Sequence, residues 1–311
     1  EAQTNEEKIR YLEEMMAIVP KHKGTDHLRA DLRRKLAKLK EASEAKKGAG
    51  RQISPFHIDK EGAGQVVLIG PTNAGKSTLV AALTNATPDA AEYPFTTWTP
   101  TPGMMEVENV QIQLIDTPSL DREHVEGELI NLIRRADLIL LVVDLQAFPI
   151  EQIENSIAFL EERRIAPSRL RERYAEERGF IFTPLLVVVN KCDDEKADAD
   201  FEVLCELIEE KWPMVPVSAS MGRNFDSFKR AVFDRLEIIR VYAKPPGKEA
   251  DLSRPFVLKK GSTVEEFAGK VHKDFLDNLK SARVWGSATH DGLMVSRDHI
   301  LRDGDVVELR I

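Results

Sequence analysis

A short apolar stretch that runs through a glycine-flanked loop into a helical stretch is the feature that most constrains the fold of this chain. Gln65–Gly70 reads QVVLIG, and Gly70–Ser77, which we name the phosphate loop, reads GPTNAGKS. This is the GxxxxGKS pattern, in which loop amides surround a phosphate and the following helix adds its positive N-terminal end. The pattern predicts a β–α unit that binds the phosphates of a nucleotide.

The positions of the phosphate loop have separate expected roles. Lys76 supplies a positive charge for the outer phosphates, and Ser77 offers its hydroxyl to Mg²⁺. A chance Gly-rich turn would need neither the strand before it nor the helix after it, so we favour a nucleotide site. The expected nucleotide contacts are Asn73, Ala74, Gly75, Lys76, Ser77 and Thr78.

Strand-like and helix-like stretches alternate after the phosphate loop. This alternation predicts an α/β fold with a mostly parallel sheet covered by helices on both faces. Ligands of such sheets bind at the carboxyl ends of the strands. The expected strands are 65–70, 110–116, 138–143, 185–189 and 214–219, and the expected helices are 123–135, 150–164, 201–212 and one starting at 224.

Polar motifs follow three of these strands. Asp116–Ser119 (DTPS), which we name the third motif, follows the strand at 110–116. A carboxylate at such a strand end can hold Mg²⁺ through water, although an aspartate that ends a strand is weak evidence alone. Asn190–Asp193 (NKCD) and Ser218–Ser220 (SAS) follow the last two strands.

The NKCD motif points to guanine. The Asp193 carboxylate can accept hydrogen bonds from N1–H and the exocyclic amine of guanine, a donor pair that adenine lacks. Asn190 and Lys191 are expected to tie this loop to the phosphate loop and the base. A backbone amide of Ser218 or Ala219 is expected to reach the guanine oxygen. Use of ATP would require the NKCD motif to be a coincidence.

Charge is divided unevenly along the chain. The formal net charge is −8, yet residues 21–51 hold 11 Lys and Arg against 4 Asp and Glu, a local +7 that leaves −15 elsewhere. Helical stretches at 6–19 and 28–42 flank a short turn and predict a basic helical hairpin, because the second has leucines at helical spacing. Its charges either meet RNA or ribosomal phosphates or only keep a solvated arm soluble.

Composition narrows the setting. Hydrophobic residues make up 42% and charged residues 31% of the chain, the balance of a globular protein. Cys192 and Cys205 are too few for a disulfide framework. No apolar stretch approaches the roughly 18–20 residues of a membrane span, and the polar N-terminus lacks the apolar region of a signal peptide. We expect a cytoplasmic protein without membrane insertion.

A resemblance to a known family rests on these motifs and on two further regions. Tyr93–Thr97 (YPFTT) resembles the first switch segment of the Obg family of GTPases, and the chain looks most like its branch of developmentally regulated GTP-binding proteins. In the tail, IRVYAKPPG, GSTVEEFAGKVHKDF and DGDVVELRI resemble a TGS domain. The resemblance implies a basic helical arm at 1–50, a P-loop GTPase domain at 62–237 and a ubiquitin-like β-grasp (TGS) domain at 238–311.

The resemblance also implies an activity and partners. The chain would bind GTP or GDP with Mg²⁺ and hydrolyse GTP slowly, with Lys76, Thr97 and Asp116 as catalytic residues. Ser77, Thr97 and Asp116 are the implied Mg²⁺ ligands, and Thr96 is the alternative to Thr97. The arm and the TGS domain imply association with ribosomes or RNA, and no motif identifies a regulatory protein partner.

The residues of the tail agree with this reading. Strand-like stretches at 238–243, 255–258, 282–285 and 306–311 surround one expected helix at 263–277. Serine and threonine followed by glutamates give overlapping capping boxes at the start of that helix. A small mixed sheet with one helix is typical of a β-grasp, here without an evident catalytic group.

Several positions depart from the family or remain open. Ser119 replaces the glycine whose N–H contacts the γ-phosphate and whose flexibility lets the second switch move. Leu120 stands where small signalling GTPases have a water-positioning Gln, as is usual in this family. Asn73 is either a K⁺ ligand, as in potassium-dependent relatives, or a turn-forming residue. Eukaryotic relatives carry an inserted domain where this chain has 165–180, which we expect to be a charged surface helix.

The serine in the third motif leaves two functions open. The first is a slow GTPase switch. The second is a nucleotide-gated module that binds RNA or ribosomes with negligible GTP hydrolysis, because Ser119 restricts the backbone. Single-turnover hydrolysis separates the two.

Overall fold

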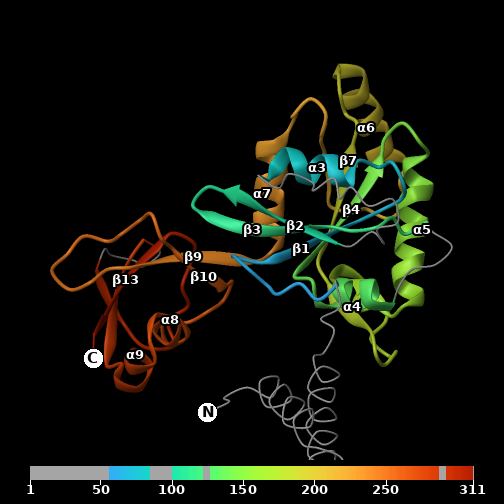
Figure 1. The fold of residues 1–311 in the computed structure, drawn as a ribbon. Helices are drawn as coiled ribbons and strands as arrows, with labels where there is room; N and C mark the ends of the chain where they lie inside the picture. The colour runs from blue at the N-terminus through green and yellow to red at the C-terminus, as the bar shows by residue number, and fades with distance from the viewer. Residues whose placement is uncertain (1–55, 85–99, 122–126, 287–291, 311) are drawn as a thin grey trace, which may run out of the picture. The chain divides into compact units, whose positions relative to one another are not determined.

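Two large β-sheets and one two-stranded sheet organise the described part of this chain. The computed structural model describes residues 56–84, 100–121, 127–286 and 292–310. The basic arm expected at 1–50 and the first switch segment at 93–97, with Thr96 and Thr97, lie outside these residues. Figure 1 shows the arrangement of the described elements.

The first sheet has six strands in the order β2-β3-β1-β4-β7-β8. All neighbouring strands are parallel except β2, which pairs antiparallel with β3 at one edge. The predicted mostly parallel sheet is therefore confirmed, with an edge strand that the sequence analysis missed. The strands are β1 Gln65–Ile69, β2 Thr101–Val107, β3 Val110–Asp116, β4 Leu138–Asp144, β7 Leu185–Asn190 and β8 Met214–Pro216.

Helices cover both faces of this sheet (Figure 1). Val67 and Ile69 of β1 pack into the core on one face, and Val66 and Leu68 pack into the core on the other. A strand buried on both faces is apolar throughout, which explains the continuous apolar runs of the sequence. The helices are α3 Lys76–Leu83 and α7 Phe225–Arg235 on one face, and α4 Gly127–Arg135, α5 Pro149–Glu162 and α6 Glu195–Leu207 on the other.

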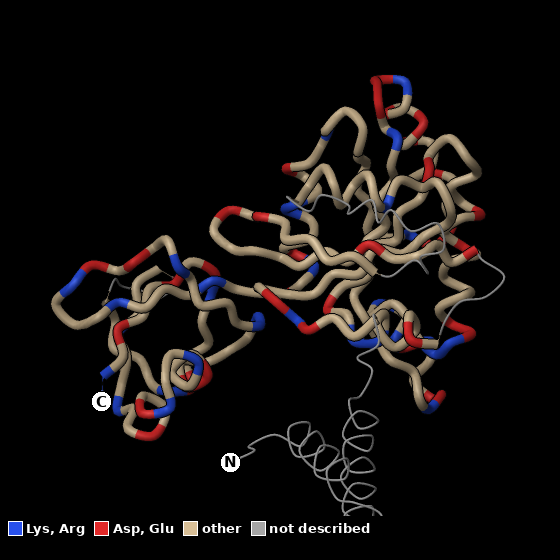
Figure 2. The backbone as a smooth tube through the Cα atoms, viewed as in Figure 1, with Lys and Arg blue, Asp and Glu red and all other residues tan. Residues whose placement is uncertain are grey.

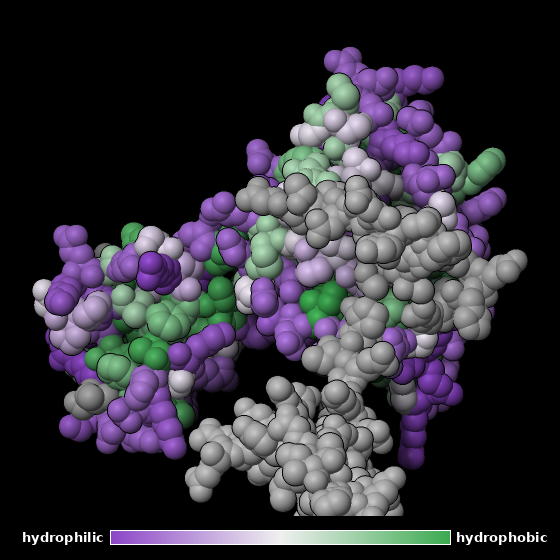
Figure 3. Space-filling view, in the orientation of Figure 1, coloured by the Kyte–Doolittle hydropathy of each residue, from purple (hydrophilic) through white to green (hydrophobic). Residues whose placement is uncertain are grey.

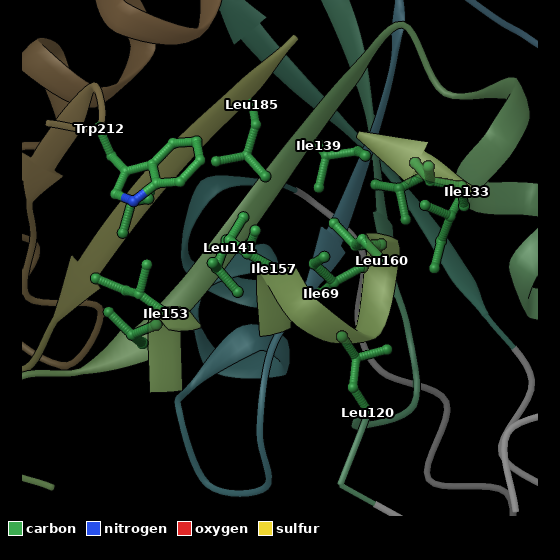
Figure 4. Packing of buried hydrophobic residues seen from close by; sticks show 14 of the residues in the cluster. Ile69, Leu120, Ile133, Ile139, Leu141, Ile153, Ile157, Leu160, Leu185 and Trp212 are labelled. Carbon is green, nitrogen blue, oxygen red and sulfur yellow. The ribbon is translucent and has the colours of Figure 1, made fainter. Parts of the chain in front are cut away.

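The core beneath α4 and α5 is drawn in Figure 4. Ile133 of α4 and Leu160 of α5 are fully buried and pack in one cluster with Ile139 and Leu141 of β4. Burying a side chain of this size contributes about 1.5–3 kcal/mol relative to leaving it exposed. Leu120, which directly follows the third motif, belongs to the same cluster, so this core also anchors part of the site.

Residues 165–180 do not form the expected charged surface helix. The segment from 165 to 183 consists of β5 Ile165–Pro167, the 3₁₀ turn η1 Ser168–Leu170, a series of turns and β6 Ile181–Thr183. β5 and β6 pair in parallel. Tyr174 stacks on Phe180 with ring centroids 4.4 Å apart, and Ile165 is buried. These apolar contacts fold the segment back on itself, which the charge pattern did not reveal.

Helix α6 begins earlier than the predicted range of 201–212. The Asp194 side chain accepts a hydrogen bond from the Ala197 N–H over 2.9 Å and caps the N-terminus. The helix ends at Leu207, and the backbone of Ile208 is extended. The cap signal lay outside the apolar stretch on which the prediction rested.

The second sheet has five strands in the order β10-β9-β13-β11-β12, with β9 and β13 parallel and the other pairs antiparallel. Val241 of β9 and Val307 of β13 pack in one cluster with Phe267 of the covering helix α8 (Val264–Val271). This mixed sheet with its helix confirms the predicted β-grasp. Its strands are β9 Ile238–Ala243, β10 Phe256–Lys259, β11 Ser281–Trp285, β12 Leu293–Val295 and β13 Asp305–Arg310.

The single helix expected at 263–277 is divided in two. α8 runs over Val264–Val271 and α9 over Lys273–Asn278. His272 between them is extended, with φ −170° and ψ 151°, and therefore interrupts the helix. Thr263 caps α8 as predicted, because its side chain accepts from the Glu266 N–H.

The described surface is polar and mixed in charge. In Figure 2, Lys and Arg are interspersed with Asp and Glu along the elements of both sheets. On the face shown in Figure 3, hydrophilic residues dominate the outline and apolar residues form smaller groups. Among the described residues, no helix combines the length and apolar character needed to cross a membrane.

Candidate functional site

The predicted motifs gather at the carboxyl ends of neighbouring strands. The phosphate loop follows β1, Asp116 is the last residue of β3, and Asn190 is the last residue of β7. Strand register pairs Leu68 with both Asp116 of β3 and Leu140 of β4, and it pairs Asp144 with Asn190. β4 and β7 therefore extend four residues beyond the level of Asp116 at the same end of the sheet. The sheet thus brings together residues that are far apart in sequence.

The phosphate loop needs its glycines because other groups approach closely. A Cβ on Gly70 would lie 2.1 Å from the Val142 carbonyl oxygen, and one on Gly75 would lie 2.2 Å from Nδ2 of Asn190. Both glycines also have positive φ, 145° and 90°. A side chain at either position would displace the loop from β4 or from the NKCD motif.

Lys76 lies buried at the start of α3. Its Nζ donates to the carbonyl oxygens of Gly70 (3.0 Å) and Pro71 (2.8 Å), so the ammonium group is held over the loop. A cavity of about 390 Å³ opens beside it. The cavity is lined by Thr72, Asn73, Gly75, Lys76, Ser77, Thr78, Thr117 and Ser119.

Asp116 and Ser77 form the most polar corner of the site. The Ser77 hydroxyl donates to Oδ2 of Asp116 over 2.5 Å, whereas the buried Oδ1 has no hydrogen-bond partner among the described residues. Burial raises the pKa of Asp116 above its ordinary value, and the Ser77 bond and the Lys76 charge only partly offset this effect. A buried carboxylate oxygen without a donor, beside a hydroxyl, is the hard oxygen set that Mg²⁺ prefers. Ser77 and Asp116 therefore fit Mg²⁺.

Asn190 connects three loops. Its Nδ2 donates to the Ala74 carbonyl of the phosphate loop over 2.8 Å, and its Oδ1 accepts from the Ala219 N–H over 3.0 Å. Asn190 is buried, so these bonds are shielded from water. Because the Ala219 amide donates to Asn190 here, its contact with a guanine oxygen stays a prediction.

Lys191 makes an ion pair that the sequence analysis did not anticipate. Its Nζ lies 2.5 Å from Oδ2 of Asp144, and its backbone is left-handed, with φ 68°. Asp144 ends β4 as Asp116 ends β3, and that shared position at a strand end was the available signal. The ion pair holds the Lys191 side chain against the end of β4.

Asp193 is exposed and held by two serines. Its Oδ1 accepts from the hydroxyls of Ser218 (2.5 Å) and Ser220 (3.3 Å). Ser218 is fully buried and also accepts from the Met221 N–H. These bonds orient the Asp193 carboxylate. The sequence motif predicts a role for the backbone amide of Ser218 but gives no sign of this role for its hydroxyl.

Asn73 has the backbone of a turn residue. Its φ of 62° lies in the left-handed region, where Asn is among the better tolerated residues. The turn accounts for Asn73 without an ion, although the residue also lines the cavity. Its K⁺ role stays a prediction.

Comparison with known proteins identifies both parts of the chain. The family described as 50S ribosome-binding GTPase matches residues 65–191, and the TGS domain matches residues 239–311. The structure of the YchF GTPase of Schizosaccharomyces pombe is similar in fold, with a TM-score of 0.55 and 12% identity over 81% of this chain and 99% of that one.

Relatives in sequence span nearly the whole chain. An uncharacterized GTP-binding protein of Methanocaldococcus jannaschii is 32% identical over 98% of this chain and 93% of its own length. Developmentally-regulated G-protein 3 of Arabidopsis thaliana is 30% identical (97% and 98%), and ribosome-interacting GTPase 1 of Saccharomyces cerevisiae is 26% identical (98% and 99%). These alignments exceed the 311 residues of this chain in length, so the relatives contain residues that it lacks. The chain therefore belongs to the developmentally regulated GTP-binding proteins, Obg-like GTPases with a C-terminal TGS domain.

Proposed function

We propose that this protein binds GTP with Mg²⁺, hydrolyses it slowly to GDP and phosphate, and acts as a molecular switch. The observation that carries the proposal is the buried Oδ1 of Asp116, which lies next to Ser77 and Lys76 and has no hydrogen-bond partner in the part of the chain that the structure describes. Mg²⁺ bound there would neutralise charge on the β- and γ-phosphate oxygens. Lys76 and the loop amides would stabilise the charge that develops as water attacks in line.

Slow turnover follows from Leu120. The residue that positions the attacking water in small signalling GTPases is replaced here by a side chain that is 7% exposed and packed into the core. Leu120 can neither reach nor orient a water molecule at the phosphates. We propose that Thr97, together with Ser77 and Asp116, completes the Mg²⁺ site.

We also propose that the protein associates with ribosomes or RNA in the cytoplasm. The contacts would come from the basic arm at 1–50 and the TGS domain at 238–311, which precede and follow the GTPase domain at 62–237 in the sequence. The name of the yeast relative and the +7 charge of residues 21–51 support this. Strand β12 is at an edge of its sheet and exposes Leu293 and Met294, which suits a docking surface.

Ribosome co-sedimentation tests the switch. We expect more protein in the ribosome pellet with a non-hydrolysable GTP analogue than with GDP, and less as salt rises. A variant lacking residues 1–50 should pellet less in both nucleotide states. Absence from the pellet at low salt with either nucleotide would refute ribosome association and leave the arm as a solvated segment.

A nucleotide-gated binding module without hydrolysis is the second candidate, favoured by Ser119 at the glycine position. Single-turnover hydrolysis of GTP in K⁺ and in Na⁺ separates the candidates. We expect hydrolysis to be faster with the protein than for GTP without protein. We also expect K⁺ to increase this rate and Asn73→Ala to remove the increase. A rate equal to that of free GTP in both salts would favour the second candidate, and equal, protein-dependent rates in both salts would remove the K⁺ role.

A further inference from the structure

Leu120, which follows the third motif, contacts the phosphate loop through its backbone N–H and the core through its side chain. The Leu120 side chain packs into the core in Figure 4, and its N–H donates to the Gly70 carbonyl over 3.2 Å. Ser119 is also buried and has no positive φ, so serine occupies this backbone conformation without left-handed strain. Ser119 and Leu120 are therefore held by burial and by a backbone hydrogen bond.

Ser119 and Asp121, on either side of Leu120, both contact Thr72 of the phosphate loop. The Thr72 N–H donates to Oδ2 of Asp121 over 3.0 Å, and the Thr72 hydroxyl donates to Oδ1 over 2.8 Å. The hydroxyl oxygens of Thr72 and Ser119 are 2.9 Å apart. We name Thr72, Ser119 and Asp121 the clamp.

Asp121 is charged at neutral pH, as this arrangement requires. Partial burial alone would raise the pKa of Asp121, but the hydrogen bonds from Thr72 and Ser119 outweigh burial and hold the pKa below its ordinary value. An ionised carboxylate accepts such bonds more strongly than a neutral group does. The clamp is thus held by charge-assisted bonds between two segments 49 positions apart.

We propose that the clamp holds Ser119 at the cavity before nucleotide binds, and that Asp121 is a positioning residue that raises the affinity for GTP relative to GDP. This inference rests on the proposed function. Thr72 and Ser119 both line the phosphate cavity, whereas Asp121 holds them from outside it. In this family the N–H at the Ser119 position contacts the γ-phosphate, which GDP lacks.

The advantage for GTP is one of conformational entropy. A segment already fixed at the cavity loses less freedom when the γ-phosphate binds than a mobile, glycine-containing switch does. The hydroxyl of Ser119 joins the fixing contacts, which a glycine could not do. Serine in place of the family's glycine thus exchanges a flexible backbone for one that is held before the γ-phosphate binds. Thr72 and Asp121 supply the partners that hold it.

The test is the ratio of GTP-analogue affinity to GDP affinity, measured with fluorescent, non-hydrolysable GTP and with GDP in Mg²⁺. Asp121→Ala should lower this ratio about tenfold, because GDP makes no use of Ser119. Thr72→Val, which keeps the shape but removes the hydroxyl, should lower it in the same direction. Thr72→Ser keeps the hydroxyl that Thr72→Val removes, and it should keep the ratio within about twofold of the wild type.

The double variant Thr72→Val/Asp121→Ala should lower the ratio little further than Asp121→Ala alone, because both changes break one clamp. An unchanged or raised ratio in Asp121→Ala and Thr72→Val, with GDP still bound, would overturn the clamp and leave the proposed function standing. A wild-type protein that binds neither nucleotide would instead overturn the proposed function, and the clamp with it.

Discussion

The side-chain amide of Asn190 donates to the carbonyl oxygen of Ala74 over 2.8 Å and joins loops that are 116 positions apart in the chain. The same side chain accepts from the Ala219 N–H. A single buried residue therefore fixes the distance between the phosphate loop and the loops expected to hold the base. Nucleotide affinity and stability should both depend on it.

Asn190→Ala should lower both quantities. The change leaves the Ala74 carbonyl and the Ala219 N–H without their partner, at about 1–3 kcal/mol for a buried group left unsatisfied. We expect thermal unfolding several degrees lower and GDP affinity reduced about tenfold or more. Calorimetry and GDP titration measure the two effects. The matched control is Asn155→Ala on the exposed side of α5, and equal effects of the two changes would refute this role.

Asp116→Asn should stabilise the nucleotide-free protein and abolish Mg²⁺-dependent GTP binding. The folded-state pKa of Asp116 lies above 3.8, so its ionised form opposes folding at neutral pH. This cost in folding free energy is absent below the unfolded pKa. It grows as pH rises from the unfolded pKa to the raised folded pKa and is constant at higher pH. Asn removes the charge and can still accept from Ser77.

Thermal unfolding at two pH values measures this effect. Without nucleotide, Asp116→Asn should unfold at a higher temperature than the wild type at pH 7, with the difference narrowing toward pH 4. Ser77→Ala provides the comparison, because it removes the Ser77 bond and leaves the charge buried. Equal destabilisation by Asp116→Asn at both pH values would show that the carboxylate is structural rather than a poised metal ligand.

The polarity of the parallel sheet explains why much of the site could be predicted. Asp116 and Asn190 end apolar strands, and parallel strands place their carboxyl ends at one edge, so the motifs had to converge. The partners of those motifs could not be read in this way. Asp144 meets Lys191 because β4 and β7 are neighbours, and strand order is not written in any local pattern.

Two other features escaped prediction for local reasons. Edge strand β2 contains Pro102 and Gly103, residues depleted in strands, so its sequence does not look like one. The clamp between Thr72 and Asp121 joins a phosphate-loop position without an expected role to a residue outside the third motif. The alternation of strand-like and helix-like stretches along the chain and the apolar runs were sufficient to predict the fold class, whereas these contacts arise only from packing.

Asp193→Asn should change the base that is preferred. Ser218 and Ser220 hold the carboxylate in place, so a change of its chemistry should act on the base rather than on the loop. An amide presents a donor where the carboxylate only accepts, which suits the carbonyl of xanthine and not the amine of guanine. Competition between GTP and xanthosine triphosphate measures the shift, expected to be about 100-fold or more in relative affinity.

The control for base recognition is Asp200→Asn. Asp200 is an exposed carboxylate of α6, close to the NKCD motif in sequence but outside it. It should leave the preference for guanine unchanged. If Asp193→Asn also keeps that preference, then the NKCD motif does not read the base in this protein.

Calorimetric titration of the whole chain with GTP and with ATP in Mg²⁺ tests the central claim most directly. We predict that GTP binds and that ATP binds at least about 100-fold more weakly, because only guanine offers the donor pair for Asp193. Lys76→Ala should weaken GTP binding about tenfold or more by removing the ammonium group held over the phosphate loop. ATP affinity equal to that of GTP, or GTP affinity unaffected by Lys76→Ala, would contradict the account.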